Sequence, residues 1–236
     1  MKLVDYTHPD PATNLALDEA LLIAAEEGAG AVLRLWELSD YAVVVGSGGS
    51  VPIDVNRGAC APAGVPVLRR ASGGGTVLLG PGCLCFSLVL GYEHAPRLNE
   101  IPASNRYILA RVLSALKPIV PAAVEGTSDL AVNGVKFSGN AQQRKRRFFL
   151  HHGTLLCGFA LELVPKYLNP PERQPEYRRD RPHAEFVTNL PATVGEVKRL
   201  LVAEWGATEE YSPLPLARAQ ELVAEKYARD EWTFRR

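Results

Sequence analysis

The spacing of apolar residues along the chain predicts four helices. From Leu15 onward such residues recur near a helical period, and Gly28 to Gly30 end this first helix. Another helix is opened by a capping box, in which Thr193 precedes Glu196 by three residues. The helical segments predicted in this way are 11–27, 103–116, the helix that Thr193 opens, and 216–228.

Shorter apolar and β-branched runs, bounded by polar or glycine-rich turns, predict strands. Residues 31–36 and 41–45 flank a polar turn and are expected to pair as a hairpin. A second hairpin is predicted over 129–137, because Asn133-Gly134 is a typical two-residue turn. Further strands are predicted at 65–70, 76–79, 83–90 and 148–157, and Gly153 could interrupt the last of them. This strand-rich middle between terminal helices indicates an α+β domain.

The uncharged stretch from Ala71 to Tyr92 is long enough for a membrane span. It contains Gly73-Gly74-Gly75 and Gly80-Pro81-Gly82, which both predict turns, so two buried strands around a tight loop fit better. With 236 residues, of which 47% are apolar, the chain can bury a sizeable core. The length suggests one large domain or two small ones.

The 26 basic and 26 acidic side chains cancel, and the formal net charge is zero. This balance disfavours a non-specific nucleic-acid binder and a polybasic membrane anchor. Residues 1–14 lack the apolar core of a secretory signal. The four cysteines show no paired framework, and Cys83 and Cys85 are too close for the usual C-x-x-C metal spacing. We therefore expect reduced thiols and a cytoplasmic location.

The segment from Arg69 to Thr76, RRASGGGT, is a candidate anion site. Three consecutive glycines expose backbone N–H groups and let a ligand approach the main chain closely. The two arginines before them can supply positive charge to a carboxylate or a phosphate. No Gly-Lys-Ser/Thr follows, so the segment is not a P-loop. The alternative is an ordinary β-turn with solvated arginines.

Asp129 and Lys136 fall on paired strands of the second predicted hairpin. A lysine there can hold an acyl carbonyl or a phosphate as a point charge, and Asp129 could bind Mg²⁺ through its carboxylate. The alternative is a surface hairpin with a Lys–Asp pair that contributes little to stability.

Two further groups of basic or titratable residues follow. His151 and His152 are adjacent on a strand and face opposite sides, so we expect one to point into a cleft and the other to pack or be solvated. The basic run consists of Arg144, Lys145, Arg146 and Arg147. It is either a solvated hairpin tip or a docking site for an acidic partner; the zero net charge disfavours nucleic acid.

The order of these motifs resembles the lipoate–protein ligase A family, which belongs to the biotin/lipoate ligase and octanoyltransferase superfamily. The segments that carry the resemblance are NLALDEALL, RLWELSDYAVVVG, RRASGGGTVLLGPG, SDLAVNGVKFSGNAQ, HHGTLL and TNL, and they span roughly residues 10–190. The resemblance implies an α+β catalytic domain built on a mixed sheet with helices packed on it. It also implies a narrow apolar tunnel for lipoate or octanoate.

In such ligases ATP activates the acid as an acyl-adenylate, and a lysine of a lipoyl carrier domain then attacks. By resemblance, Lys136 would hold the acyl carbonyl and phosphate oxygens, and Asp129 would lie near Mg²⁺ or the triphosphate. The carboxylate or phosphate end would be clamped by Arg70, Ser72, Gly73, Gly74, Gly75 and Thr76. The acyl and nucleotide pocket would be lined by Ser138, Gly139, Asn140, Ala141, His152, Gly153 and Thr154. An acidic carrier surface would dock on the basic run.

The chain departs from the ligase pattern at several places. Leu79 and Gly80 stand where the pattern has a His–Asp pair, and 46–50 (GSGGS) replaces G-R-x-Q-N. Ser128-Asp129 replaces Asn-Asp. After the last predicted helix only Asp230 to Arg236 remain, so we expect a single catalytic domain without the small C-terminal accessory domain, which an accessory subunit could replace.

These departures leave two alternatives open. One is an ATP-independent octanoyl- or lipoyltransferase that works through a cysteine thioester. Residues 118–128 contain no cysteine, whereas the cysteine-dependent relatives carry their nucleophile upstream of the lysine hairpin. Cys83 and Cys85 lie on a strand that we expect to be buried, where thiols are poor nucleophiles. The other alternative is a non-catalytic subunit that binds a carrier or a ligand and needs a partner chain.

Overall fold

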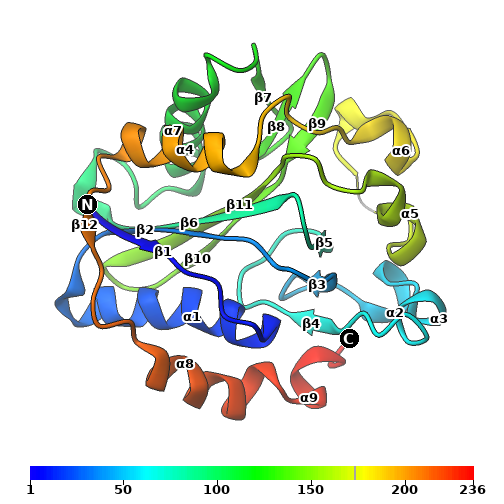
Figure 1. The fold of residues 1–236 in the computed structure, drawn as a ribbon, viewed down its shortest axis with the longest axis horizontal. Helices are drawn as coiled ribbons and strands as arrows, with labels where there is room; N and C mark the ends of the chain where they lie inside the picture. The colour runs from blue at the N-terminus through cyan, green and yellow to red at the C-terminus, as the bar shows by residue number, and fades with distance from the viewer. Residues whose placement is uncertain (173) are drawn as a thin grey trace.

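The chain folds around a six-stranded mixed sheet in a computed structural model that describes residues 1–172 and 174–236 (Figure 1). Its first two strands, β1 and β2, run parallel, whereas β2, β6, β11 and β10 pair in antiparallel fashion. In spatial order the strands are β10 (Asn140–Arg144), β11 (Phe148–Leu156), β6 (Cys83–Gly91), β2 (Val32–Trp36), β1 (Lys2–Asp5) and β12 (Glu209–Glu210). The predicted α+β class and mixed sheet are confirmed.

Two three-stranded sheets stand beside the large one. The first has the order β4 (Val67–Arg69), β3 (Ala42–Val45), β5 (Val77–Leu79). The second has the order β7 (Ala123–Glu125), β8 (Asp129–Val132), β9 (Val135–Ser138). The hairpin predicted for 31–45 is wrong, because β2 pairs with β1 and β6 while β3 pairs with β4 and β5. The Asn133-Gly134 turn between β8 and β9 is confirmed, with φ values of 50° and 72°.

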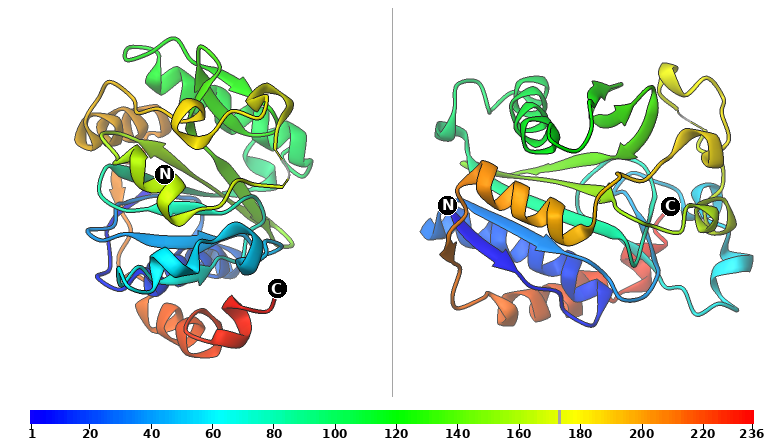
Figure 2. Two further views of the ribbon diagram at one scale, coloured as in Figure 1. Left: turned by 90° about the vertical axis from the view of Figure 1, so that its right-hand side faces the viewer. Right: turned by 45° about the horizontal axis from the view of Figure 1, so that its top comes forward.

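Helices cover both faces of the large sheet, as Figures 1 and 2 show. Helix α1 (Pro11–Ala24) packs on one face, with α8 (Leu216–Leu222) behind it. Helices α4 (Ile101–Leu116) and α7 (Val194–Trp205) pack on the other. Each strand therefore contributes alternate residues to two cores: in β6, Val89 joins the α1 core and Phe86 joins the α4–α7 core. Burial on both faces explains why this strand is apolar apart from Ser87.

The helix ends follow the expected capping chemistry. Asp10 accepts the backbone N–H of Thr13 at 2.8 Å and begins α1. The capping box of Thr193 and Glu196 is confirmed at the start of α7. The helix predicted over 216–228 is confirmed as α8, which a π-helical turn (Val223–Tyr227) continues. No helix in the described ranges combines the length and the hydropathy that a membrane crossing needs.

The short helices gather at one end of the molecule, on the right in Figure 1. They are α2 (Val51–Asp54), α3 (Arg57–Cys60), α5 (Val164–Tyr167), α6 (His183–Phe186) and α9 (Asp230–Thr233). Strand β11 runs toward this end without the interruption considered at Gly153, because Gly153 pairs with both Phe86 and Asn140. Its missing side chain is required there: a Cβ would lie 1.9 Å from Oδ1 of Asn140.

Candidate functional site

A cleft of about 1010 Å³ opens at this end, between the two small sheets and the ends of β10 and β11. It brings together most of the predicted site residues, although they come from distant parts of the chain. Those that line it are Arg70, Gly74, Gly75, Thr76, Asp129, Lys136, Ser138, Gly139, Asn140, Ala141, His152, Gly153 and Thr154. Ser72 and Gly73 do not line the cleft; they contact Arg70 behind it.

The glycine loop is shaped by Arg70 from inside. Its guanidinium donates from Nη2 to the carbonyls of Gly73 and Gly75, and from Nε to Oγ of Ser72 at 3.0 Å. Burial lowers the pKa of Arg70 to about 10. With its donors engaged, Arg70 holds the loop open toward the cleft. The clamp on a carboxylate or phosphate stays a prediction, and the backbone N–H groups of this loop are its remaining candidate donors.

Glycines allow the loop to lie directly against its neighbours. Gly74 has a φ of 84°, and a Cβ on Gly46 would lie 2.1 Å from the carbonyl oxygen of Gly74. A Cβ on Gly74 would contact Ala141 at 3.5 Å. The loop and the first residues of β10 thus form one continuous wall of the cleft, and a side chain at Gly46 would push them apart.

Lys136 reaches this wall from β9 and is held by Asp129. The Lys136 Nζ lies 2.8 Å from Asp129 Oδ1, and the hydroxyl of Tyr177 donates to Asp129 Oδ2 at 2.7 Å. Burial first, and then the bond to Asp129, raise the pKa of Tyr177, so its hydroxyl stays a donor. Lys136 remains 28% exposed, which leaves its ammonium accessible from the cleft.

The predicted role of Asp129 as a possible Mg²⁺ ligand stays a prediction. Both of its carboxylate oxygens already accept from Lys136 and Tyr177. Within residues 1–172 and 174–236, no group of three or more His, Cys, Asp or Glu side chains is placed to hold a metal. What the structure shows for Asp129 is its ion pair with the Lys136 ammonium.

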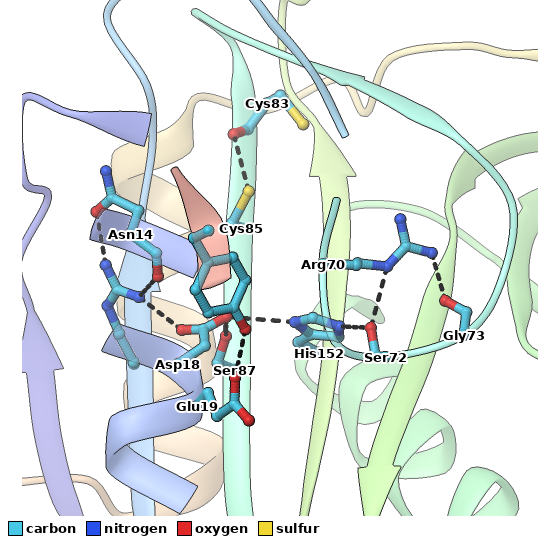
Figure 3. A network of polar contacts seen from close by, with 12 residues as sticks. Asn14, Asp18, Glu19, Arg70, Ser72, Gly73, Cys83, Cys85, Ser87 and His152 are labelled. Atoms are coloured by element: carbon cyan, nitrogen blue, oxygen red, sulfur yellow. Dashed lines mark hydrogen bonds and ion pairs between the residues drawn. The ribbon is translucent and has the colours of Figure 1, made fainter. Parts of the chain in front are cut away.

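A chain of buried hydrogen bonds connects the glycine loop to helix α1 (Figure 3). His152 lies 2.6 Å from Ser72 through Nε2 and 3.3 Å from Asp18 Oδ2 through Nδ1. Ser72 Oγ accepts from Arg70, so its hydrogen can be donated to Nε2, and the Nδ1–H of His152 then donates to Asp18. Hydrolase triads share the order Ser–His–Asp. Ser72 is only 2% exposed, so its hydroxyl is not placed to attack a substrate as the serine of a triad does. The hydrogen bonds instead hold the glycine loop in position.

Asp18 is the charged anchor of this chain of bonds. Arg34 lies behind it at 2.6 Å, and Ser87 donates to its other oxygen at 2.7 Å. Burial alone would raise the pKa of Asp18, but Arg34, His152 and Ser87 outweigh it, and the pKa is lowered. Sequence analysis placed Asp18 in a helix and assigned it no role. The signal that could have found it is a polar position on a helix that is otherwise apolar there.

The two adjacent histidines face opposite sides, as predicted. His152 points to the cleft, whereas His151 is fully buried and stacks on Phe86. Burial, and the nearby His152, lower the pKa of His151 to about 3, which keeps it neutral.

The proline- and arginine-rich segment 169–182, which follows α5, forms a wall of the cleft in its described part. Arg178 is only 5% exposed and lines the cleft with His183 and Phe186. The segment continues along β9, because the backbone N–H of Thr188 donates to the carbonyl of Lys136 at 2.8 Å. The proline- and arginine-rich composition of this segment is typical of a surface loop, so its role in the cleft could not be predicted from the sequence.

The cleft also depends on the end of the described chain. Arg69, fully buried, donates from Nε to the carbonyls of Trp232 and Thr233, at 3.1 and 3.0 Å. Its Nη1 donates to the carbonyls of Gly46 and Gly49 at 2.8 Å. The two adjacent arginines of the sequence motif therefore both have structural roles: Arg69 fixes the 46–50 loop, and Arg70 fixes the glycine loop.

The basic run lies at the β10–β11 turn, away from the cleft. Strand β10 separates it from Asn140 by roughly 14 Å, at about 3.4 Å per residue. Arg144 donates to the carbonyl of Leu98 at 2.6 Å, and Arg147 pairs with Glu26 at 3.7 Å. The run therefore has an acid, Glu26, beside it, and its exposed residues are Arg146 and Arg147. Carrier docking there stays a prediction.

All four cysteines are buried and unpaired. Burial raises the pKa of the Cys85 thiol. It also raises the pKa of the Cys157 thiol, to about 12. Cys85 borders the cleft but lies behind its polar wall, next to Asp18. No thiol in the described ranges has the exposed, electropositive surroundings of a catalytic cysteine.

Comparison with known proteins gives one consistent picture. The model of the lipoyl protein ligase A/B catalytic domain matches residues 10–205. The "Probable lipoate-protein ligase A" of Mycoplasma pneumoniae is 33% identical over 172 residues, which are 72% of this chain and 50% of the relative. The chain thus spans about half the length of that relative. Octanoyltransferase LipM of Geobacillus kaustophilus is 26% identical over 273 residues, covering 100% of this chain and 98% of the relative.

Solved structures share the fold over nearly the whole chain. A bi-partite lipoate protein ligase of Thermoplasma acidophilum, studied with its E2 lipoyl domain, superposes with a TM-score of 0.85 at 23% identity and covers 99% of this chain and 95% of its own. A T. acidophilum protein with bound lipoic acid superposes with a TM-score of 0.84 at 21% identity, and the match covers 100% of this chain and 98% of that protein. A lipoate-protein ligase A bound with ATP superposes with a TM-score of 0.80 at 21% identity, and the match covers 99% of this chain and 98% of that protein. At these identities the matches establish the fold.

Proposed function

The chain belongs to the lipoyl protein ligase A/B catalytic-domain family, and we propose on that basis that it activates lipoate or octanoate with ATP and transfers the acyl group to a lysine of a lipoyl carrier domain. The observation that carries this proposal is the position of the Lys136 ammonium, held by Asp129 beside the start of β10, which the glycine loop contacts. A fixed cation and a loop of backbone donors in one cleft suit a reaction that develops negative charge on oxygen.

The proposed reaction has two steps. A carboxylate oxygen of the acid attacks the α-phosphorus of ATP, and pyrophosphate leaves. The amine of the carrier lysine then attacks the acyl carbonyl, loses a proton and displaces AMP. Lys136 would stabilise the oxygens on which charge develops, and the cleft would align the reactants, so no protein nucleophile is required.

The shape and lining of the cleft support both substrates. Its volume of about 1010 Å³ is at the upper end of ordinary ligand pockets, which leaves space for a nucleotide and an acyl chain together. An apolar wall suited to the acyl chain is formed by Leu15, Trp36, Val44, Leu79 and Phe86. Structural neighbours were solved with lipoic acid and with ATP, and one was studied with its E2 lipoyl domain. Mg²⁺, where ATP brings it, would be held by phosphate oxygens and water.

Pyrophosphate exchange tests the first step directly. The purified chain, with ATP, Mg²⁺ and lipoate or octanoate, should move label from pyrophosphate into ATP only when the acid is present. A carrier domain added afterwards should gain the acyl mass. If the chain alone is inactive but a second subunit restores exchange, the expected accessory subunit is supported. Without exchange in either case, the ATP-dependent proposal fails.

The second candidate is an ATP-independent octanoyltransferase, which the full-length match to LipM favours. Transfer from an octanoyl carrier to a second carrier in the absence of ATP would support it. The burial of all four thiols speaks against a cysteine thioester, so such transfer would have to be direct. If neither activity is found and a carrier still binds tightly, the chain is a binding subunit.

A further inference from the structure

One arginine in the cleft wall presents unoccupied donors. Arg178 ends the 3₁₀ turn Glu176–Arg178 and is only 5% exposed. Its Nε donates to the carbonyl of Arg181 at 3.0 Å, and its guanidinium stacks over Phe186, 4.7 Å from the ring centroid. Among the described residues, no group accepts from its two terminal nitrogens, and neither of them is sealed from solvent. The open space that Arg178 borders is the cleft.

Two more basic groups share this space. His183, the first residue of α6, lines the cleft beside Arg178, and burial together with the positive charges of Arg178 and Lys136 lowers the pKa of His183 to about 4. His183 therefore lies within the electrostatic reach of both cations, and the imidazole is neutral near pH 7. Their arrangement is fixed by backbone: a β-bridge joins Lys136 to Val187, one residue after α6.

The nearby carboxylates offset this positive charge only in part. Asp129 is already shared between Lys136 and Tyr177. Asp180, which attracts Arg178 from the same segment, is exposed and accepts from Gln174. A buried guanidinium from which no described carboxylate accepts is costly, so the position of Arg178 at the cleft points to an anionic ligand.

We propose that Arg178 and His183, together with Lys136, bind the phosphate groups of the nucleoside triphosphate. The inference rests on the proposed function and deepens it. It also accounts for the departures from the ligase pattern: polar contacts are missing at Leu79, Gly80 and the 46–50 loop, and the segment that carries Arg178 and His183 supplies others.

An oligophosphate suits the cluster better than the carboxylate of lipoate does. The planar guanidinium presents a fork of donors that matches two phosphate oxygens, and the ammonium of Lys136 adds a point charge. A neutral imidazole can donate one further hydrogen bond, and a phosphate beside it stabilises the imidazolium. A carboxylate carries one charge on two oxygens, whereas an oligophosphate offers several charged oxygens spread over a longer span to the three groups.

Binding measurements on matched variants test the inference. Arg178→Gln should weaken the binding of ATP and of inorganic pyrophosphate by about 10- to 100-fold, the range for losing hydrogen bonds to a charged group. The affinity for lipoate should change by less than about twofold. Arg179→Gln is the control, because this neighbour is exposed and carries the same charge. It should bind all three ligands as the unchanged protein does.

A second variant keeps the test independent of folding. Arg178→Gln removes the stacking on Phe186, so its melting temperature is measured as well. His183→Ala leaves that stacking in place and should weaken pyrophosphate binding by about 3- to 10-fold. If both variants bind ATP and pyrophosphate normally, or if only lipoate binding falls, the inference is overturned. If the unchanged chain binds pyrophosphate through Arg178 but shows no exchange with any acid, the phosphate site stands and the proposed function fails.

Discussion

Replacing Arg34 with methionine should strongly destabilise the protein. Arg34 is fully buried and donates to Asp18 Oδ1 at 2.6 Å and to Asn14 Oδ1 at 2.7 Å. Methionine fills similar space but leaves the Asp18 charge buried without its cation. Breaking a buried ion pair in this way costs about 3–5 kcal/mol, a large part of the total stability of about 5–15 kcal/mol. With a urea m-value of about 3 kcal/mol/M, the unfolding midpoint should fall by about 1–1.7 M.

The pH dependence of this loss gives a sharper test. With Arg34 present, the pKa of Asp18 is lowered on folding, so its stabilisation is present above the unfolded pKa of about 3.9 and is lost as pH falls through the folded value. Without Arg34, burial dominates and raises the folded pKa of Asp18. The variant should therefore gain stability as pH falls from 7 towards 5, while the unchanged protein should not.

Tryptophan fluorescence during urea unfolding at pH 7 and pH 5 measures both effects. Arg97→Met is the matched control, because Arg97 pairs with Glu100 on the surface and is 67% exposed. Its midpoint should not move measurably. The reasoning is refuted if Arg34→Met shifts the midpoint at pH 7 by less than about 0.3 M, or if its deficit is equally large at pH 5.

Three further predictions concern the reaction. Lys136→Ala should slow acyl transfer at least about 100-fold and shift the melting temperature by no more than about 3 °C, because the pair with Asp129 is partly exposed. A folded variant with full activity would remove Lys136 from the mechanism. Iodoacetamide at pH 7.5 should leave activity unchanged, because every thiol is buried and the pKa of Cys157 is about 12; rapid inactivation would revive the thioester route. Arg146→Glu should slow modification of an acidic carrier several-fold at low salt and flatten its salt dependence. Identical kinetics would place docking elsewhere.

The local elements were predictable where one short-range signal decides them. The Asn133-Gly134 turn fixed the hairpin that presents Lys136, and the capping box fixed the start of α7. The partners of the 31–36 and 41–45 strands were not predictable, because both strands are buried on both faces and, apart from Arg34, apolar. Such runs carry no register or pairing information, and pairing is decided by sheets assembled from distant segments.

The site was predictable only in part, for a related reason. Motif order identified Lys136 and the glycine loop, whose chemistry is local. The roles of Arg70 and Arg178 depend on their surroundings. Arg70 donates its hydrogen bonds to the glycine loop, whereas Arg178 is buried by stacking on Phe186. An arginine in a proline-rich segment is indistinguishable from a solvated one until those contacts are known.

The bonds from Arg69 to Trp232 and Thr233 bear on how the protein is made. They join residues 163 and 164 positions apart, and the same guanidinium fixes the 46–50 loop of the cleft. At a synthesis rate of about 5–20 residues per second, roughly 8–33 s pass between the synthesis of Arg69 and that of the residues whose carbonyls accept from it. A nascent chain can therefore form much of the large sheet early, yet its cleft stays incomplete until Thr233 has emerged. The cleft therefore takes its final shape only after the segment that carries Trp232 and Thr233 has been made.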